Sequence, residues 1–110
     1  MKALQTNKKY YDTYKMYSAA QLFFDIIDGD FQYTLKKGEL EIEVNDPYIS
    51  DDDEIVYFTD ASGKEVLQLS GEMEIDAYML SHPSESTWRE MAMEYIIHSE
   101  QGEFTLLCKA

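Results

Sequence analysis

Hydrophobic and polar residues alternate with a period of two through much of the middle of the chain, and this pattern predicts β-strands. The alternation is clearest in segments 31–36, 39–44 and 72–79, where every second residue is apolar. Because successive side chains of a strand point to opposite faces of a sheet, each segment should have one buried and one exposed face. Segment 55–59 is apolar at most positions, which predicts a central strand that is covered on both faces.

Turn-forming residues separate these strands at regular intervals. Turns are expected at Lys37-Gly38, Asn45-Asp46-Pro47, Asp60–Lys64 and Ser70-Gly71. The Asp60–Lys64 turn should hold Gly63 at positive φ, which glycine adopts without steric cost. Two further short apolar segments, 66–69 and 104–108, complete the expected sheet.

A first helix is predicted to end at Gly29, and the sequence leaves two starting points open. Ser18 and Gln21 have the spacing of a capping box, which would start the helix there. Alternatively, the helix begins near Asn7, because five apolar and aromatic residues then share one face at 3.6-residue spacing. These five residues are Tyr10, Tyr14, Tyr17, Phe24 and Ile27. We favour the longer helix, with a kink near Ser18.

A second helix is predicted after His82-Pro83, from about Ser84 or Thr87 to Gln101, with Gly102 ending it. Thr87 and Glu90 have capping-box spacing. The inward stripe of this helix would be Trp88, Met91, Ala92, Tyr95 and Ile96. The element order α-β-β-β-β-β-α-β predicts one acidic α+β domain over residues 1–110. It would have a mainly antiparallel sheet of about five to six strands, an N-terminal helix and a second helix before the last strand.

Composition predicts a folded cytoplasmic protein. Of the 110 residues 45% are hydrophobic and 14% aromatic, which is enough to build a core. The single cysteine, Cys108, excludes an intrachain disulfide, fits a reducing compartment and is expected to be a small buried apolar residue. The first nine residues lack the apolar stretch of a signal peptide. No apolar run approaches the roughly 18 residues of a membrane span.

Charge changes this picture most. The formal net charge is −13, with +3 on residues 1–17 and −16 on the rest. Direct binding to nucleic acid or to an anionic membrane is therefore disfavoured. Between Gly38 and Trp88 there are fourteen carboxylates and one lysine, Lys64. Surfaces that serve only solubility usually mix both signs, so this imbalance favours a cationic partner.

The carboxylates are expected in ordered rows. Side chains two apart on a strand are about 6.8 Å apart, so two neighbouring rows would place one carboxylate per roughly 3.4 Å, as along one strand of duplex DNA. Glu39, Glu41 and Glu43 form one such row, and Glu72, Glu74 and Asp76 form the other. The sequence leaves open whether these two rows are neighbours in the sheet. The predicted partner-binding residues are Glu39, Glu41, Glu43, Asp51, Asp52, Asp53, Glu54, Glu72, Glu74 and Asp76, together with Tyr10 and Tyr11. The alternative is an ordinary acidic, solvated sheet face.

Four tyrosines crowd the lysine-bearing start of the chain. Tyr14 and Tyr17 are expected to cover the core. Tyr10 and Tyr11 are better candidates for an interface, at the rim of a partner site or in a homodimer, because tyrosine is enriched at protein interfaces.

No catalytic, metal or cofactor site is predicted. His82 and His98 lack zinc-site spacing, and His98 is expected to pair with Glu94 on the second helix. Residues 28–39 have the acidic first and twelfth positions of a calcium loop, but Tyr33 replaces the glycine required at the sixth. The acidic run 51–54 would attract divalent ions only loosely.

In charge, size and compactness the chain is similar to small acidic inhibitors of phages and other mobile elements. These include anti-CRISPR, anti-restriction and uracil-glycosylase-inhibitor proteins, several of which imitate nucleic acid. The resemblance implies a non-enzymatic inhibitor whose carboxylates bind the basic surface of a nucleic-acid-binding protein, such as a nuclease or defence effector. Two alternatives stay open: an immunity protein that neutralises a basic bacterial toxin, and a structural or adaptor subunit whose acidity is incidental.

Overall fold

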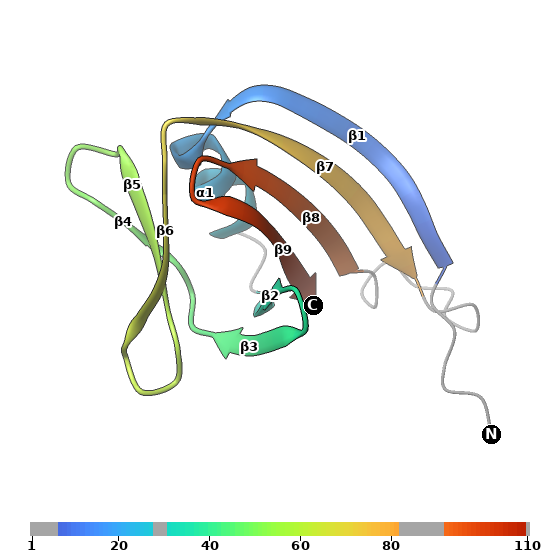
Figure 1. Ribbon diagram of the computed structural model, residues 1–110. Coiled ribbons are helices and arrows are strands. Elements are labelled where there is room, and N and C mark those ends of the chain that lie inside the picture. The colour runs from blue at the N-terminus through green and yellow to red at the C-terminus, as the bar shows by residue number, and fades with distance from the viewer. Residues whose placement is uncertain (1–6, 28–30, 82–91, 110) are drawn as a thin grey trace.

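The computed structural model describes residues 7–27, 31–81 and 92–109, which form two antiparallel sheets and one helix (Figure 1). The six-stranded sheet has the order β1-β7-β8-β9-β2-β3, and the three-stranded sheet has the order β4-β5-β6. The strands of the larger sheet are β1 (Asn7–Ser18), β7 (Glu72–Ser81), β8 (Ala92–Ser99), β9 (Gly102–Lys109), β2 (Gln32–Lys37) and β3 (Leu40–Val44). Those of the smaller sheet are β4 (Tyr48–Ile49), β5 (Ile55–Thr59) and β6 (Glu65–Ser70), and the helix is α1 (Ala19–Ile27).

One hydrophobic core joins the helix to both sheets. Strands β1, β7, β8 and β9 bend in the same direction, with α1 beneath them and the smaller sheet beside it (Figure 1). The core receives side chains from α1, from the inner face of the larger sheet and from one face of the smaller sheet. Its fully buried members include Leu22, Ile26, Val56, Phe58, Leu69, Ile75, Ile97 and Leu106. The opposite, outer face of the larger sheet therefore carries the alternate, more polar residues.

The long first helix is wrong: residues 7–18 form β1, and the helix begins at Ala19. β1 pairs antiparallel with β7, and its register shifts twice. The capping-box alternative is confirmed, because the Gln21 N–H donates to Ser18 Oγ at 3.1 Å and the Ser18 N–H donates to Gln21 Oε1 at 3.0 Å. The tyrosine spacing before Ser18 fits a helical period and not a strict period of two, and the second register shift lets Tyr14 and Tyr17 both pack against the core. The predicted stop at Gly29 lies outside the described residues.

The second predicted helix is wrong over residues 92–99, which form β8 between β7 and β9. Its predicted start at Ser84 or Thr87, and Trp88 with it, lie outside the described residues. In β8, Met93, Tyr95 and Ile97 face the core, whereas Glu94, Ile96 and His98 face outward. Ile96 is apolar although it lies on the outer face. This extra apolar position made the sequence of β8 compatible with a helical period as well. Gly102 opens β9 instead of ending a helix.

The mainly antiparallel architecture is confirmed, with one helix among the described residues where two were expected. Gly63 has the expected positive φ, +87°. β5 is central in its sheet, but its second face is only half covered, since Ile55, Tyr57 and Thr59 remain partly exposed. None of the described residues belongs to a helix with the length and apolar character that a membrane crossing requires.

Candidate functional site

The two predicted acidic rows point to the same outer face of the larger sheet, but they are not neighbours. Glu41 and Glu43 lie on β3, at one edge, and Glu39 lies in the turn before it. Glu72, Glu74 and Asp76 lie on β7. Three strands separate β3 from β7, so the rows are roughly 19 Å apart at four strand spacings of about 4.8 Å. The paired-row geometry, with its doubled charge density, does not occur.

A lysine also lies beside the row on β3. Lys36 of β2 lies directly opposite Glu41, and Thr34 lies opposite Glu43. Residues directly opposite in an antiparallel pair have their Cβ atoms about 5 Å apart, within reach of charge–charge attraction. Glu39, Glu41 and Glu43 therefore form a small separate patch.

The acidic loop 51–54, in contrast, does meet the row on β7. Asp53 and Glu54 line the same shallow hollow as Glu72, at the end of the helix where Ser18 and Ala19 lie. Hydrogen bonds within the loop fix its shape: the Ser50 hydroxyl donates to Asp52 Oδ1, which also accepts from the Glu54 N–H at 3.2 Å. The Ser50 hydroxyl is the main reason that the pKa of Asp52 is lowered. The structure thus joins two sequence segments into one anionic region.

Two further glutamates extend this region across the sheet. His98 of β8 lies opposite Glu74 of β7 and opposite Glu103 of β9, and Glu100 lies in the turn between β8 and β9. Glu72, Glu74, His98 and Glu100 line a second hollow together with Lys15. We call the resulting set of nine carboxylates the acidic surface. It consists of the four carboxylates of the loop, Asp51, Asp52, Asp53 and Glu54, of which Asp53 and Glu54 line the hollow beside Glu72, together with Glu72, Glu74, Asp76, Glu100 and Glu103.

Sequence reasoning missed Glu100 and Glu103 because it placed residue 100 in a helix and began the last strand at Phe104. The alternation of Glu103, Thr105 and Leu107 with Phe104, Leu106 and Cys108 was the pattern that could have placed Glu103 on the outer face.

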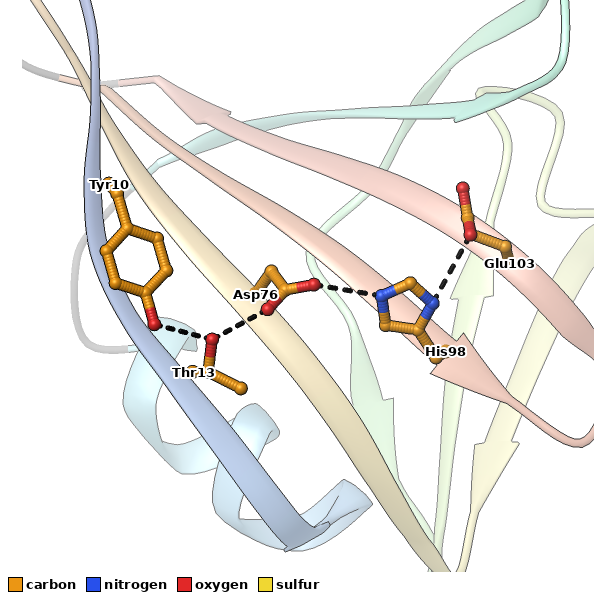
Figure 2. A network of polar contacts seen from close by, with 5 residues as sticks. All are labelled: Tyr10, Thr13, Asp76, His98 and Glu103. Atoms are coloured by element: carbon orange, nitrogen blue, oxygen red, sulfur yellow. Dashed lines mark hydrogen bonds and ion pairs between the residues drawn. The ribbon is translucent and has the colours of Figure 1, made fainter.

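A hydrogen-bonded network runs through the acidic surface over four neighbouring strands (Figure 2). The Tyr10 hydroxyl lies 2.6 Å from Thr13 Oγ1, which donates to Asp76 Oδ1 at 2.7 Å. Asp76 Oδ2 lies 3.0 Å from His98 Nε2, and His98 Nδ1 lies 3.3 Å from Glu103 Oε1. The hydrogen bond from the Thr13 hydroxyl, followed by that from the His98 ring, holds the pKa of Asp76 below its ordinary value.

The expected pairing of His98 with Glu94 is replaced by this network. Four residues along a strand span about 13 Å, which is too far for contact, whereas the same spacing on a helix brings side chains together. Both ring nitrogens of His98 now face carboxylates. A neutral imidazole has only one N–H, so the imidazolium alone donates to both at once. Through these contacts the network ties strands β1, β7, β8 and β9 together on the outer face.

The four tyrosines near the start of the chain differ in burial as expected, although they lie on a strand and not on a helix. Tyr10 and Tyr11 are 55% and 56% exposed, whereas Tyr14 and Tyr17 pack against the core with their rings stacked at 4.8 Å. Tyr10 also meets Tyr78 edge-on, with ring centroids 5.7 Å apart. The interface roles of Tyr10 and Tyr11 stay predictions.

Buried titratable groups lie on the opposite, core-facing side. Cys108 is fully buried as expected, and burial raises the pKa of its thiol to about 12. Burial is also the main cause that raises the pKa of Tyr95. Within the described ranges, no three His, Cys, Asp or Glu side chains are placed to hold a metal ion. Tyr33, from the calcium-like segment, is buried in β2, and its hydroxyl donates to the Ile26 carbonyl at 2.8 Å.

No protein-family model matches the chain, and comparisons with curated proteins and with solved structures likewise gave no match. Its function therefore has to be inferred from its own residues and their arrangement.

Proposed function

We propose that this chain is a small, acidic, non-enzymatic inhibitor that binds the basic surface of a nucleic-acid-binding protein, such as a nuclease or defence effector. The observation that carries this proposal is the acidic surface itself. Nine carboxylates from the loop 51–54, from β7, from the turn after β8 and from β9 gather there, with Lys15 and His98 beside them. Such a field attracts a cationic groove and raises the rate of encounter with it.

The rigidity of the acidic surface supports binding. Asp76 is fixed by Thr13 and His98, and Asp52 is fixed by Ser50. Side chains that are already ordered lose less conformational entropy when a partner binds. Their lowered pKa values also keep both carboxylates ionised at pH values below the ordinary range for aspartate.

We propose that the acidic surface imitates the negative charge of nucleic acid but not its charge density. A single row on β7 places one carboxylate per about 6.8 Å, half the density that two adjacent rows would give. The inhibitor would therefore compete for the nucleic-acid groove without reproducing the charge density of a duplex. The patch Glu39, Glu41 and Glu43 lies too far along the sheet to join the same row.

The proposal is tested by affinity capture from host lysate with elution in salt steps. The wild type is compared with Glu72→Lys/Glu74→Lys and with the matched control Glu41→Lys/Glu43→Lys. Both double variants change the charge equally, on exposed side chains of the same sheet face. A basic nucleic-acid-binding protein should be captured by the wild type and the control, and lost from the β7 variant. Capture should weaken tenfold or more between about 0.1 and about 0.5 M salt, because salt screens the attraction.

Competition with nucleic acid then distinguishes binding in the nucleic-acid groove from nonspecific charge attraction. Duplex DNA or RNA should displace the captured protein if the acidic surface occupies its nucleic-acid groove. Capture that survives high salt, resists nucleic acid or is equally affected by the two double variants would show that the proposed mechanism is wrong.

A further inference from the structure

The outer face of the three-stranded sheet carries a row of side chains that the acidic surface does not use. Tyr48 of β4, Tyr57 of β5 and Gln68 of β6 lie directly opposite one another in register. Their neighbours along the strands, such as Val56 and Leu69, are buried in the core. Because side chains alternate along a strand, the row Tyr48, Tyr57 and Gln68 faces away from the core.

The two tyrosine rings of this row are stacked. Their centroids are 4.9 Å apart and their planes differ by 18°. Tyr48 is the outer member and is 49% exposed. A stacked pair of rings is rigid and presents a flat aromatic surface, a property of side chains that anchor protein interfaces.

Carboxylates lie toward both ends of β5, on either side of this row. Glu65 pairs with Thr59 and accepts a hydrogen bond from Gln68 Nε2 at 2.6 Å, so its carboxylate is held on the same face. The loop 51–54 lies at the other end, between β4 and β5. Residues 45–71 contain seven carboxylates and one basic residue, Lys64. The seven are Asp46, Asp51, Asp52, Asp53, Glu54, Asp60 and Glu65. This charge repels an anionic ligand and favours a cationic one.

An aromatic plane between carboxylates fits guanidinium better than ammonium. Guanidinium is planar, weakly hydrated and stacks on aromatic rings while it donates hydrogen bonds to carboxylates at its edge. The lysine ammonium is compact and strongly hydrated, so it gains less from an exposed ring. The combination therefore selects for arginine among cationic side chains.

We propose that the face formed by Tyr48, Tyr57, Gln68 and Glu65 is a docking surface for an arginine-bearing segment of a protein partner. One guanidinium stacks on the exposed ring of Tyr48, and further arginines of the same segment reach Glu65 and the loop 51–54. This inference goes beyond the proposed function, because the row Tyr48, Tyr57 and Gln68 lies on a different face and docking there requires no particular class of partner; the loop 51–54 borders both surfaces.

The test uses two peptides of equal charge, deca-arginine and deca-lysine, titrated against the full chain at about 0.15 M salt. The wild type should bind deca-arginine about two- to fivefold more tightly than deca-lysine, the range expected for one exposed cation–π contact. Tyr48→Leu should remove most of this preference, because it should weaken deca-arginine binding more than deca-lysine binding. The matched control is Phe24→Leu, which alters another half-exposed aromatic residue with a ring contact, on α1. It should keep the preference.

Backbone amide shifts in NMR spectra give a second readout that needs no variant. Deca-arginine should perturb residues 48, 57 and 68 more than residues on β1. The inference is overturned if the wild type shows no arginine preference, if Tyr48→Leu keeps it, or if Phe24→Leu loses it equally. Sedimentation velocity tests whether a second copy of this chain occupies the face instead. A dimer that Tyr48→Leu abolishes would assign the face to self-association and would also overturn the inference of an arginine-bearing partner. None of these results depends on whether a nucleic-acid-binding partner is captured.

Discussion

His98 Nε2 lies 3.0 Å from Asp76 Oδ2, and this contact links β8 to β7 on the outer face of the larger sheet. The other carboxylate oxygen of Asp76 accepts from Thr13 on β1, and the other ring nitrogen of His98 faces Glu103 on β9. Glu74 lies opposite His98 in register. One aspartate and one histidine therefore connect four strands in an environment that is otherwise acidic.

Asp76→Asn should reduce stability in a pH-dependent manner. Because the pKa of Asp76 is lowered in the folded protein, its stabilising contribution is present above its unfolded pKa, ordinarily about 3.9, and is lost as pH falls through the lower folded value. The difference in Tm between wild type and variant should be clear near pH 6 and should shrink below about pH 3.5. Thermal melts followed by circular dichroism from pH 3 to 7 measure it. A difference that is constant over this range would contradict the assignment, and Glu72→Gln on the same strand is the control.

Ile97→Ala and Ile96→Ala distinguish the strand from the helix that the sequence pattern suggested. Ile97 is fully buried, whereas Ile96 lies on the outer face. We expect Ile97→Ala to lower the free energy of unfolding by about 2–5 kcal/mol, and Ile96→Ala by less than half as much. Urea denaturation gives both values. A larger effect at Ile96 would contradict the register of β8.

Ser18→Ala should destabilise the start of α1. The variant loses the hydroxyl that accepts from the Gln21 N–H, which should cost about 1 kcal/mol. Ser70→Ala, at an exposed position at the end of β6, serves as the control and should stay within about 0.5 kcal/mol of the wild type. Chemical denaturation of the two variants and the wild type makes the comparison. Equal losses at Ser18 and Ser70 would argue against a capping role.

Cys108 should be nearly inert to iodoacetamide in the folded protein. With the pKa of the thiol raised to about 12, roughly one thiol in ten thousand is ionised at pH 8, and burial blocks access as well. Labelling should become fast when denaturant unfolds the chain, and mass spectrometry after timed quenching follows it. Rapid labelling of the folded protein would show that Cys108 is accessible and that β9 is not the buried strand described.

Local pattern in the sequence was sufficient for much of the sheet. Strands β2, β3, β5, β6, β7 and β9 were recognisable because apolar residues alternate or cluster over short segments between turn residues. The turn with Gly63 at positive φ and the burial of Cys108 follow from such local chemistry. The capping box at Ser18 was visible in the sequence, but the tyrosine spacing favoured an earlier start of the helix, and that start was wrong. The excess of carboxylates between Gly38 and Trp88 is likewise a property of the sequence alone.

Tertiary structure decided those features that depend on contacts between segments distant in the chain. The side-chain pattern of β8 suits either period and that of β1 favours a helical one, and both segments become strands because neighbouring strands supply their hydrogen bonds; Tyr14, for example, pairs with Ile75. Strand order also set the acidic surface, since it separated Glu41 from Glu74 and brought Glu103 beside His98. Residue spacing fixes which face of a strand a side chain takes, but only the pairing of strands fixes which side chains meet across a sheet.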